Sequence, residues 1–346
     1  MDRYARQTVL PGFGAEAQAR LAGARVLVIG AGGLGSTVIP ALAAAGVGTL
    51  GIVDDDVVEL SNLHRQHIHG VDDLGTSKVR SAAESVRRID PAIVVLELDD
   101  RLTARNAPSL IKDYDLVVDG CDDLDTRYVV DDVAALADVP VVWGSVSQFS
   151  GQVSVAWASR GPRYRDLFPS PPPADSVVSC AVGGVFPTTV AVIGALMATE
   201  ALKILTGVGS PLLGRVTLFD ARTGGFRHLD YARDPSSAAP APPAELSVGP
   251  ERFAELRDDG ALVVDVREPW ELEIARMEDA VAIPLDTLDA AMPNLDVDRG
   301  ILVVCHHGVR SRTARDRLIE HGFTARHLAG GIDGWARFCD PGMTRY

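Results

Sequence analysis

A turn made largely of glycine, at residues 30–35, constrains the fold of this chain more than any other feature. It reads Gly-Ala-Gly-Gly-Leu-Gly and follows an apolar, β-branched run at 25–29. Small residues with helical character continue to Ala45, and a second apolar run occupies 49–53. A strand, a glycine turn, a helix and a strand form one βαβ unit of a parallel sheet. The pattern therefore predicts an α/β fold with a Rossmann-like, doubly wound sheet.

The four glycines of this turn, Gly30, Gly32, Gly33 and Gly35, suit a nucleotide phosphate. Without side chains the backbone can approach a phosphate closely, and the following helix presents free N–H groups to it. Asp54 ends the next strand, where an acidic side chain usually holds a ribose hydroxyl. These features fit NAD, FAD, S-adenosylmethionine or ATP. The alternative is a packing turn that binds no ligand.

Charged residues elsewhere favour ATP with magnesium. Arg6 lies near the start, Arg65 lies in the run 61–66, Lys78 opens a helix, and Asp122 follows a strand. A triphosphate needs cations and a carboxylate that holds magnesium, whereas a dehydrogenase needs only a cradle for the pyrophosphate. Each residue alone is more often a solvated surface charge, but together they favour a triphosphate.

The remaining periodicity predicts two α/β domains. Further strands are expected in the first domain at 93–98, 116–119, 139–143, 152–157 and 215–220, with helices at 77–88 and 188–206. Residues 234–246 are rich in proline and alanine, which is typical of a semi-extended linker. Beyond it, strands at 262–266 and 301–305 and a helix at 312–321 are expected. We therefore predict a nucleotide-binding domain at 1–232, a linker at 233–246 and a smaller α/β domain at 247–346.

The first domain resembles the ubiquitin-activating-enzyme-like adenylyltransferases, in the ThiF-like branch that serves molybdopterin synthase and thiamine synthesis. The resemblance covers about residues 3–230 and rests on Arg3-Tyr4-Ala5-Arg6-Gln7, Leu10-Pro11-Gly12-Phe13-Gly14, the glycine turn, Asp54-Asp55-Asp56, Ser61-Asn62-Leu63-His64-Arg65-Gln66, Lys78, and Asp122 with Thr126-Arg127. It implies that ATP activates the C-terminal glycine of a small ubiquitin-like sulfur-carrier protein ending in Gly-Gly. The products would be an acyl-adenylate and pyrophosphate.

The resemblance also implies roles for individual residues. Asp54 would hold the ribose, Arg65 and Lys78 the phosphates, and Asp122 the Mg2+ that accompanies ATP. The counterpart of Arg6 reaches the triphosphate from the partner subunit of a homodimer, so Arg6 and Arg65 are candidate catalytic residues. The predicted nucleotide site comprises Gly30, Gly32, Gly33, Gly35, Asp54, Asp56, Asn62, Arg65, Gln66, Lys78 and Asp122.

The sequence departs from this family at the structural zinc site. Family members usually carry two C-x-x-C pairs, but Arg163 and Asp166 stand where the first pair would lie, and residues 234–243 hold no cysteine. We therefore predict no zinc, and we expect packing to hold the loop or the loop to be more mobile. Asp123 also replaces the usual asparagine after Asp122, and we assign it no role.

A second reactive centre is predicted at Cys305, in the run Cys305-His306-His307-Gly308-Val309-Arg310-Ser311 between a strand and a helix. A loop of this kind can direct backbone N–H groups at the sulfur, and the helix start and Arg310 would stabilise a thiolate or persulfide anion. A buried cysteine at a strand end is the alternative, but it would not explain the glycine, arginine and serine at these spacings.

This loop resembles the active-site loop of a rhodanese domain. The resemblance covers about residues 246–346 and includes Val264-Asp265-Val266-Arg267-Glu268-Pro269, Ile283-Pro284-Leu285 and Leu328-Ala329-Gly330-Gly331-Ile332-Asp333-Gly334-Trp335. It implies that Cys305 accepts sulfur as a persulfide from a donor such as a cysteine desulfurase and passes it to the activated carrier. Asp265 and Arg267 are expected to hold the fold.

The other three cysteines are Cys121, Cys180 and Cys339. Cys180 resembles a family cysteine implicated in thiol chemistry, and we expect it to attack the Cys305 sulfur and release a carrier thiocarboxylate. A structural cysteine on a crossing loop is the competing interpretation. Cys121 and Cys339 are interpreted as core or near-surface thiols. His64, His67 and His69 are interpreted as lining or surface residues.

Charge and hydropathy limit the partners. The net charge of -14 argues against nucleic acid, and an acidic partner protein would need a local basic patch. The most apolar run, 183–205, is interrupted by Glu200 and Lys203 and is interpreted as a core helix, so we expect no membrane span. Scattered cysteines and the absence of a signal-peptide pattern predict a cytoplasmic protein.

Three other hypotheses about function are an activating enzyme whose second domain only docks a sulfur donor, an NAD-dependent oxidoreductase, and a non-catalytic scaffold.

Overall fold

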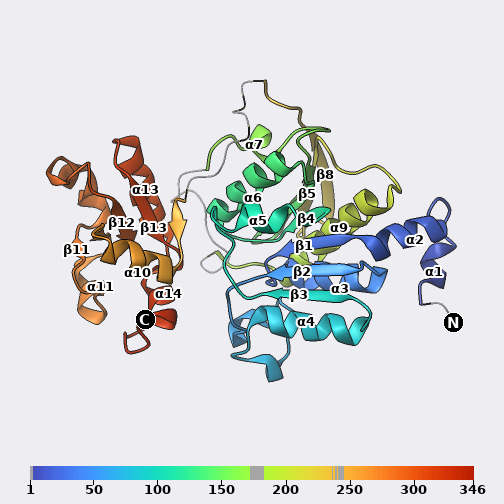
Figure 1. Ribbon diagram of the computed structural model, residues 1–346, viewed down its shortest axis with the longest axis horizontal. Helices are drawn as coiled ribbons and strands as arrows, with labels where there is room; N and C mark the ends of the chain where they lie inside the picture. The colour runs from blue at the N-terminus through green and yellow to red at the C-terminus, as the bar shows by residue number, and fades with distance from the viewer. Residues whose placement is uncertain (1–2, 172–182, 236, 238–239, 241–244) are drawn as a thin grey trace. The chain divides into compact units, whose positions relative to one another are not determined.

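The computed structural model describes residues 3–171, 183–235, 237, 240 and 245–346. These residues form two compact units, one made of residues up to Ser170 and from Gly183 to Pro240, the other of residues from Glu245 to Tyr346. Both are α/β units (Figure 1). The predicted site at Cys180 lies outside the described residues.

The larger unit is built on an eight-stranded sheet in the order β3-β2-β1-β4-β5-β6-β7-β8. The strands are β1 (Arg25–Ile29), β2 (Thr49–Val53), β3 (Val94–Leu98), β4 (Leu116–Asp119), β5 (Val141–Ser147), β6 (Ser150–Ala156), β7 (Arg215–Asp220) and β8 (Gly225–Asp230). The first five are parallel, and β5 to β8 pair antiparallel. The predicted Rossmann-like order is confirmed. Strand β8 was not expected, because it lies on the sheet edge with every residue exposed and so shows little alternation of apolar and polar residues.

Helices cover both faces of this sheet (Figure 1). Alternate residues of β1 point to opposite faces: Val26 and Val28 pack in one apolar core, and Leu27 and Ile29 pack in the other. The helices are α1 (Ala5–Thr8), α2 (Gly14–Gly23), α3 (Gly35–Ala45), α4 (Lys78–Ile89), α5 (Ala107–Ile111), α6 (Leu124–Ala137), α7 (Tyr164–Leu167) and α9 (Pro187–Thr206), with 3-10 turns at Leu60–Asn62 and Val71–Asp73.

Helix α9 is the one described helix that is long and apolar enough to cross a membrane by length and composition. It packs against α3, β5 and β6, and Ile193, Met197 and Ala201 on it have no exposed surface. These contacts are those of a core helix, as the interrupted apolar run predicts.

The smaller unit has a parallel five-stranded sheet in the order β11-β10-β12-β13-β9. The strands are β9 (Ser247–Val248), β10 (Leu262–Asp265), β11 (Val281–Ala282), β12 (Ile301–Val304) and β13 (Ala325–Leu328). The helices are α10 (Pro250–Asp258), α11 (Pro269–Ile274), α12 (Leu288–Ala291), α13 (Val309–Glu320) and α14 (Gly331–Phe338), with 3-10 turns at Leu285–Thr287 and Met292–Asn294. Cys305 follows β12 directly, so the sheet places this sulfur at its carboxyl edge.

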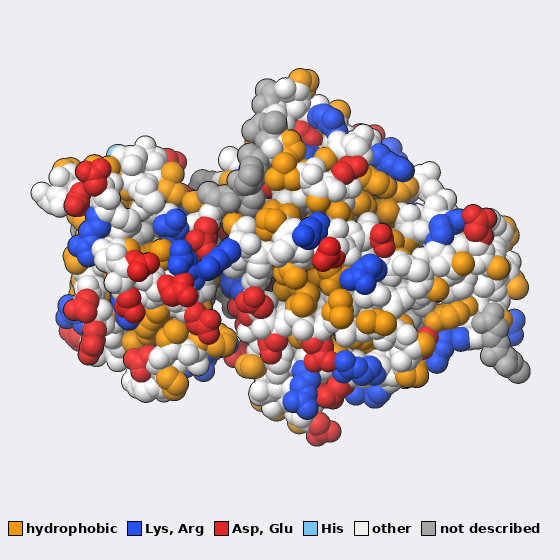
Figure 2. All heavy atoms as spheres, in the orientation of Figure 1, with side chains coloured by type: hydrophobic (Ala, Val, Ile, Leu, Met, Phe, Trp, Pro, Cys, Tyr) orange, Lys and Arg blue, Asp and Glu red, His pale blue; other side chains and the backbone are white. Residues whose placement is uncertain are grey.

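Charged side chains of both signs are interspersed over the face of each unit that Figure 2 shows. Despite the net charge of -14, this face is therefore not uniformly acidic. Oppositely charged side chains on a partner protein can find local matches on this face.

The glycine turn allows an unusually close approach of two backbone segments. Gly30 has φ +90 and donates its N–H to the carbonyl oxygen of Val53 at 2.8 Å. A Cβ on Gly35 would lie 2.1 Å from the Gly30 carbonyl oxygen. Because backbone atoms cannot retreat as a flexible side chain can, any residue other than glycine at position 35 would separate β1 from the start of α3.

We predict that Gly35→Ala lowers the free energy of unfolding of the larger unit by at least about 2 kcal/mol, because it overpacks a rigid turn. Gly23→Ala is the matched control: it also lies in a helix, and a Cβ there meets nothing within 4 Å. Chemical denaturation of both variants tests this. Equal stability of the two variants would contradict the assignment of Gly35 to a steric role.

Candidate functional site

The carboxyl edge of the larger sheet gathers the predicted nucleotide-binding residues. Asp54, just after β2, accepts the N–H of Ala31 in the glycine turn at 2.8 Å and that of Asp56 at 2.9 Å. Burial, helped by the neighbouring Asp56, raises the pKa of Asp54 to about 6, and Lys78 opposes this rise. The Asp54 carboxylate thus joins the turn to the end of β2.

Lys78 brings a positive charge to the same carboxylates. Its side chain is 7% exposed, and its Nζ lies 2.6 Å from Asp56 Oδ2. Burial works to lower the pKa of Lys78, but the carboxylates of Asp54, Asp56 and Asp122 outweigh burial and raise it. The structure therefore places Lys78 as a fixed cation among three of the aspartates that the sequence singles out.

Gln66 lies against the glycine turn with an unused hydrogen-bond acceptor. It is buried, its Nε2 is 3.6 Å from where a Cβ on Gly32 would stand, and its Oε1 is buried with no hydrogen-bond partner. Asn62 precedes it in a 3-10 turn and is also buried. A buried amide oxygen without a partner beside a glycine-rich turn fits a site that a ligand completes.

Arg65 is partly exposed; its Nη1 donates to the Ser61 carbonyl oxygen at 3.1 Å and lies 2.8 Å from His64 Nε2. His64 and His67 are exposed. His69 is buried and bridges the Ala31 carbonyl oxygen, at 3.0 Å, to Ser81 Oγ, at 2.8 Å. Of the three histidines, His69 therefore lines the glycine turn, and it ties the turn to α4.

Arg6 lies far from the glycine turn of its own chain. Its helix, α1, is fixed by Gln7, which donates to the Ala45 carbonyl oxygen at 2.8 Å, and by Tyr4, which donates to Asp90 at 2.6 Å. Ala45 ends α3, whereas the turn precedes the start of that helix. Eleven helical residues span about 16 Å, which is more than an arginine side chain can cross. The structure thus separates Arg6 from the other candidate residues.

Sequence reasoning missed Arg101 at this edge, and it named Arg127 in a motif without assigning it a role. Arg101 approaches Asp55 at 3.7 Å and Asp123 at 3.4 Å, and these carboxylates raise its pKa against the effect of burial. Arg127 donates to the carbonyl oxygens of Cys121, at 2.6 Å, and Gly144, at 2.8 Å. Arg101 neutralises the extra carboxylate that distinguishes this chain from its family. The sequence carried no periodic signal for that pairing, because the partners come from three separate loops.

Asp123 itself has a structural role. As the residue before α6, it accepts hydrogen bonds from the N–H and hydroxyl of Thr126 at 2.8 and 2.7 Å. An aspartate three residues before a threonine, after a strand, is a helix N-cap pattern. That pattern could have assigned this role from the sequence.

Hydrogen bonds join the two segments where the resemblance would place zinc-binding cysteines. One Asp166 oxygen accepts the N–H of Arg163 at 2.7 Å, and the other accepts the N–H of Asp234 at 3.1 Å. Arg233 Nη2 also donates to the Gly161 carbonyl oxygen at 2.7 Å. In the described part of the chain, no three histidine, cysteine, aspartate or glutamate side chains are grouped to hold a metal. The loop is therefore held by a carboxylate and an arginine.

We predict that Asp166→Ala lowers the free energy of unfolding of the larger unit by about 1–3 kcal/mol, because it leaves two backbone N–H groups without their acceptor. Asp72→Ala, at an exposed carboxylate in a 3-10 turn, is the control, and thermal denaturation is the measurement. An Asp166→Ala variant as stable as the control would show that packing alone holds this loop.

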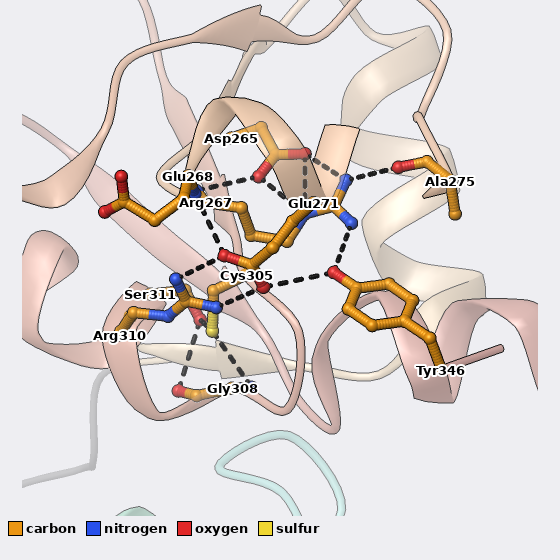
Figure 3. A network of polar contacts seen from close by, with 10 residues as sticks. All are labelled: Asp265, Arg267, Glu268, Glu271, Ala275, Cys305, Gly308, Arg310, Ser311 and Tyr346. Carbon is orange, nitrogen blue, oxygen red and sulfur yellow. Dashed lines mark hydrogen bonds and ion pairs between the residues drawn. The ribbon is translucent and has the colours of Figure 1, made fainter. Parts of the chain in front are cut away.

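The second site surrounds Cys305, whose side chain is 1% exposed (Figure 3). Its Sγ accepts the N–H of Gly308 at 3.1 Å and lies 3.4 Å from Ser311 Oγ. Gly308 has φ +92 and precedes α13, so the loop turns directly from the strand into a helix start. The positive end of α13 and one backbone donor thus face the sulfur, as the loop sequence predicts.

The sequence suggested Arg310 as a partner of the sulfur anion. In the structure its guanidinium is also paired with a carboxylate. Its two terminal nitrogens bind the two oxygens of Glu271, each at 2.6 Å, and Figure 3 shows this fork beside Cys305. Tyr346 donates to Glu271 at 3.1 Å and accepts from Arg267 at 2.9 Å. Burial works to raise the pKa of Glu271, but these donors, with the N–H of Glu268, lower it to about 2. The guanidinium is thus fixed by a permanently ionised partner.

The remaining loop residues form an aromatic stack. The ring of His306 stacks on that of His307 at 3.7 Å and on that of Tyr346 at 4.0 Å. Burial and the neighbouring His307 lower the pKa of His306, which favours its neutral form. Val309 begins α13 and is 37% exposed. The loop therefore offers a partly apolar rim beside the sulfur.

Three other groups that the sequence singles out lie apart from these contacts to the sulfur. Arg267 is fully buried and binds Asp265 at 2.6 Å and the Ala275 carbonyl oxygen at 2.9 Å, which ties β10 to α11. Cys121 is partly buried, and burial raises its pKa well above the usual range. Cys339 is exposed. Arg267 therefore has a structural role, whereas Cys121 is a partly buried thiol and Cys339 an exposed one.

Comparisons with known proteins identify two families along the chain. Residues 4–239 match the ThiF family, and residues 249–338 match the rhodanese-like domain. The chain is 42% identical to the probable adenylyltransferase/sulfurtransferase MoeZ of Mycobacterium tuberculosis, over 99% of this chain and 95% of that protein. It is 38% identical to the adenylyltransferase and sulfurtransferase MOCS3-1 of Zea mays, over 99% and 83%.

Two further relatives concern the larger unit. A sulfur carrier protein adenylyltransferase of Thermus thermophilus is 48% identical over 68% of this chain and 89% of that protein. A crystal structure of E. coli MccB with ATP has a TM-score of 0.61 and 20% identity over 68% of this chain and 74% of that one. At that identity the likeness concerns the fold alone.

Proposed function

This chain belongs to the ThiF family and carries a rhodanese-like domain, and we propose that its two units perform two consecutive steps on one small protein. It is an enzyme with adenylyltransferase and sulfurtransferase activities. The larger unit adenylylates the C-terminus of a sulfur-carrier protein, and the smaller unit supplies sulfur that converts this C-terminus to a thiocarboxylate. The carrier is a small ubiquitin-like protein ending in Gly-Gly.

The observation that carries the first step is the meeting of a glycine turn, a buried lysine and several carboxylates at one sheet edge. We propose that Asp54 binds ribose hydroxyls and that Lys78 binds phosphate oxygens, for which it would exchange its present contact with Asp56. The buried Oε1 of Gln66, which has no hydrogen-bond partner, could accept a hydrogen bond from a ligand beside Gly32. These groups fit ATP better than NAD, because a dinucleotide needs no buried cation beside the turn.

Adenylylation needs positioning and charge neutralisation more than covalent catalysis. The carrier carboxylate attacks the α-phosphorus, the bond to the bridging oxygen breaks, and pyrophosphate leaves. Arg65 and Lys78 neutralise the charge that develops on the phosphates. Mg2+, held by Asp122, would bind phosphate oxygens and add to this neutralisation.

Arg6 is proposed to act in the site of a second copy of the chain. Its helix is fixed at the far end of α3 from the glycine turn, so it cannot serve its own site. In a homodimer the same surface patch of each copy can reach the other copy's site. The triphosphate would then be bound by both subunits.

Sulfur transfer is proposed to run through Cys305. Its thiolate takes the outer sulfur of a donor persulfide, as from a cysteine desulfurase, and the donor leaves as a thiolate. The outer sulfur of the Cys305 persulfide then attacks the carrier acyl carbon, and AMP leaves. Attack of the Cys180 thiolate on the Cys305 sulfur breaks the acyl disulfide, which releases the carrier thiocarboxylate and leaves a Cys180–Cys305 disulfide. A cellular thiol reductant restores both thiols.

The first step is tested by ATP–pyrophosphate exchange with purified sulfur carriers ending in Gly-Gly, added one at a time. We predict exchange that depends on the carrier and falls at least about 100-fold in Asp122→Asn, because the phosphate charge is then left without its metal. A carrier lacking its last glycine is the control. A chain that gives no exchange with any carrier would leave only the sulfurtransferase step.

Mixing two inactive variants tests the proposed role of Arg6. Arg6→Ala and Asp122→Asn should each lose exchange, and mixed dimers should contain one complete site in two. Random mixing then restores about one quarter of the wild-type rate, since half of the dimers are mixed. Arg6→Lys, which keeps the charge, is the control for a purely electrostatic role. If mixing restores no activity, Arg6 does not act across a dimer.

A further inference from the structure

Behind Cys305 lies a polar chain that ends at a buried histidine. Ser311, in the first turn of α13, has no exposed surface, and His327 on β13 is 3% exposed. Ser311 Oγ lies 3.4 Å from Cys305 Sγ, 3.2 Å from the Gly308 carbonyl oxygen and 3.3 Å from His327 Nδ1. Three groups thus converge on a single hydroxyl.

The number of protons fixes the direction of these contacts. A hydroxyl has one proton to donate and two lone pairs to accept with. The Gly308 carbonyl oxygen can only accept, so it takes the Ser311 proton when Cys305 is a thiol. The Cys305 S–H then fills one lone pair of Ser311, and an N–H on His327 Nδ1 fills the other. All three contacts are satisfied only if His327 carries a proton on Nδ1.

Loss of the Cys305 proton changes the acceptor of the Ser311 hydroxyl proton. It does not change the hydrogen bond between His327 and Ser311. The sulfur anion can no longer donate, so the Ser311 hydroxyl turns its proton from Gly308 to the sulfur. The Gly308 carbonyl oxygen keeps a partner, because it also accepts the N–H of Arg312 at 3.2 Å. The N–H of His327 Nδ1 still binds the Ser311 oxygen, which holds the hydroxyl at the distance the sulfur needs.

We propose that His327 is a positioning residue for sulfur transfer, which fixes the Ser311 hydroxyl as a hydrogen-bond donor to the thiolate or persulfide of Cys305. This inference rests on the proposed role of Cys305. In this role, the N–H on Nδ1 of His327 donates a hydrogen bond to Ser311. This donation does not require the imidazole to change its charge. An amide N–H placed at the same position can therefore replace it.

Other charged and titratable groups around the loop act on the sulfur and must stay constant in the test. They are Arg310, Arg312 and Arg315 on α13, Glu271 on α11, His306 and His307 in the loop, Asp265 at the end of β10, Arg267 after it, Asp333 on α14, and Tyr346. The Arg310–Glu271 pair contributes little net charge, because its two partners are joined by two hydrogen bonds. Substitution of His327 or Ser311 removes none of these groups.

The test is the pH dependence of Cys305 alkylation by iodoacetamide in the full chain, followed on the Cys305 peptide by mass spectrometry. Ser311→Ala, His327→Leu and His327→Gln should each raise the pH midpoint by about one unit, because an anion loses one hydrogen bond. His327→Asn should keep the wild-type midpoint, because the Asn side-chain amide reaches the place of Nδ1, whereas that of Gln reaches the place of Nε2. The exposed Cys339 is the internal control.

A double variant guards against misfolding as the cause. If His327 acts only through Ser311, then His327→Leu adds no further shift in a Ser311→Ala background. Additive shifts, an Asn variant that behaves like the Leu variant, or an unshifted Leu variant would each overturn the proposal. Failure of the proposed function looks different, because it would abolish carrier-dependent exchange or thiocarboxylate formation and leave the alkylation midpoints as predicted.

Discussion

The contact between the start of α3 and the end of β1 governs how the larger unit works. Gly35 lies so close to the Gly30 carbonyl oxygen that a single Cβ would stand 2.1 Å from it. This approach aims the N–H groups of α3 along the sheet edge, and Asp54 fixes the turn by accepting the N–H of Ala31. Lys78 and Asp122 then act on the same space. If this turn opened, the phosphate cradle and the carboxylates would separate together.

Both units contain the same structural motif, a glycine of positive φ between a buried strand and a helix start. In each, a glycine with φ near +90, Gly30 or Gly308, turns the chain from a buried strand toward a helix start. A helix start favours negative charge, and we propose that this charge is a phosphate in the larger unit and a sulfur anion in the smaller one. The surrounding side chains make the difference: a buried lysine faces carboxylates in one case, and a serine anchored by a histidine faces a cysteine in the other.

Features encoded by local patterns were predictable from the sequence, whereas pairings between distant loops were not. The βαβ unit, the core helix α9 and the Cys305 loop follow from runs of apolar residues and glycines, and each is confirmed as an element of the fold. The partnership of Arg101 with Asp55 and Asp123, and that of Arg310 with Glu271, depend on how loops meet in space. The contact of Asp166 with the N–H of Asp234, which lies far away in the sequence, could not be predicted for the same reason.

The claim that one chain both activates a carrier and gives it sulfur is tested most directly by mass spectrometry of the carrier C-terminus. The full chain, ATP, magnesium, a persulfide donor and a carrier would be incubated, and thiocarboxylate would be measured beside AMP. The account predicts thiocarboxylate in the wild type, and in Cys305→Ala a carrier that is still adenylylated yet receives no sulfur. Equal thiocarboxylate formation by the Cys305→Ala variant would contradict it and would leave the rhodanese-like domain only a docking role.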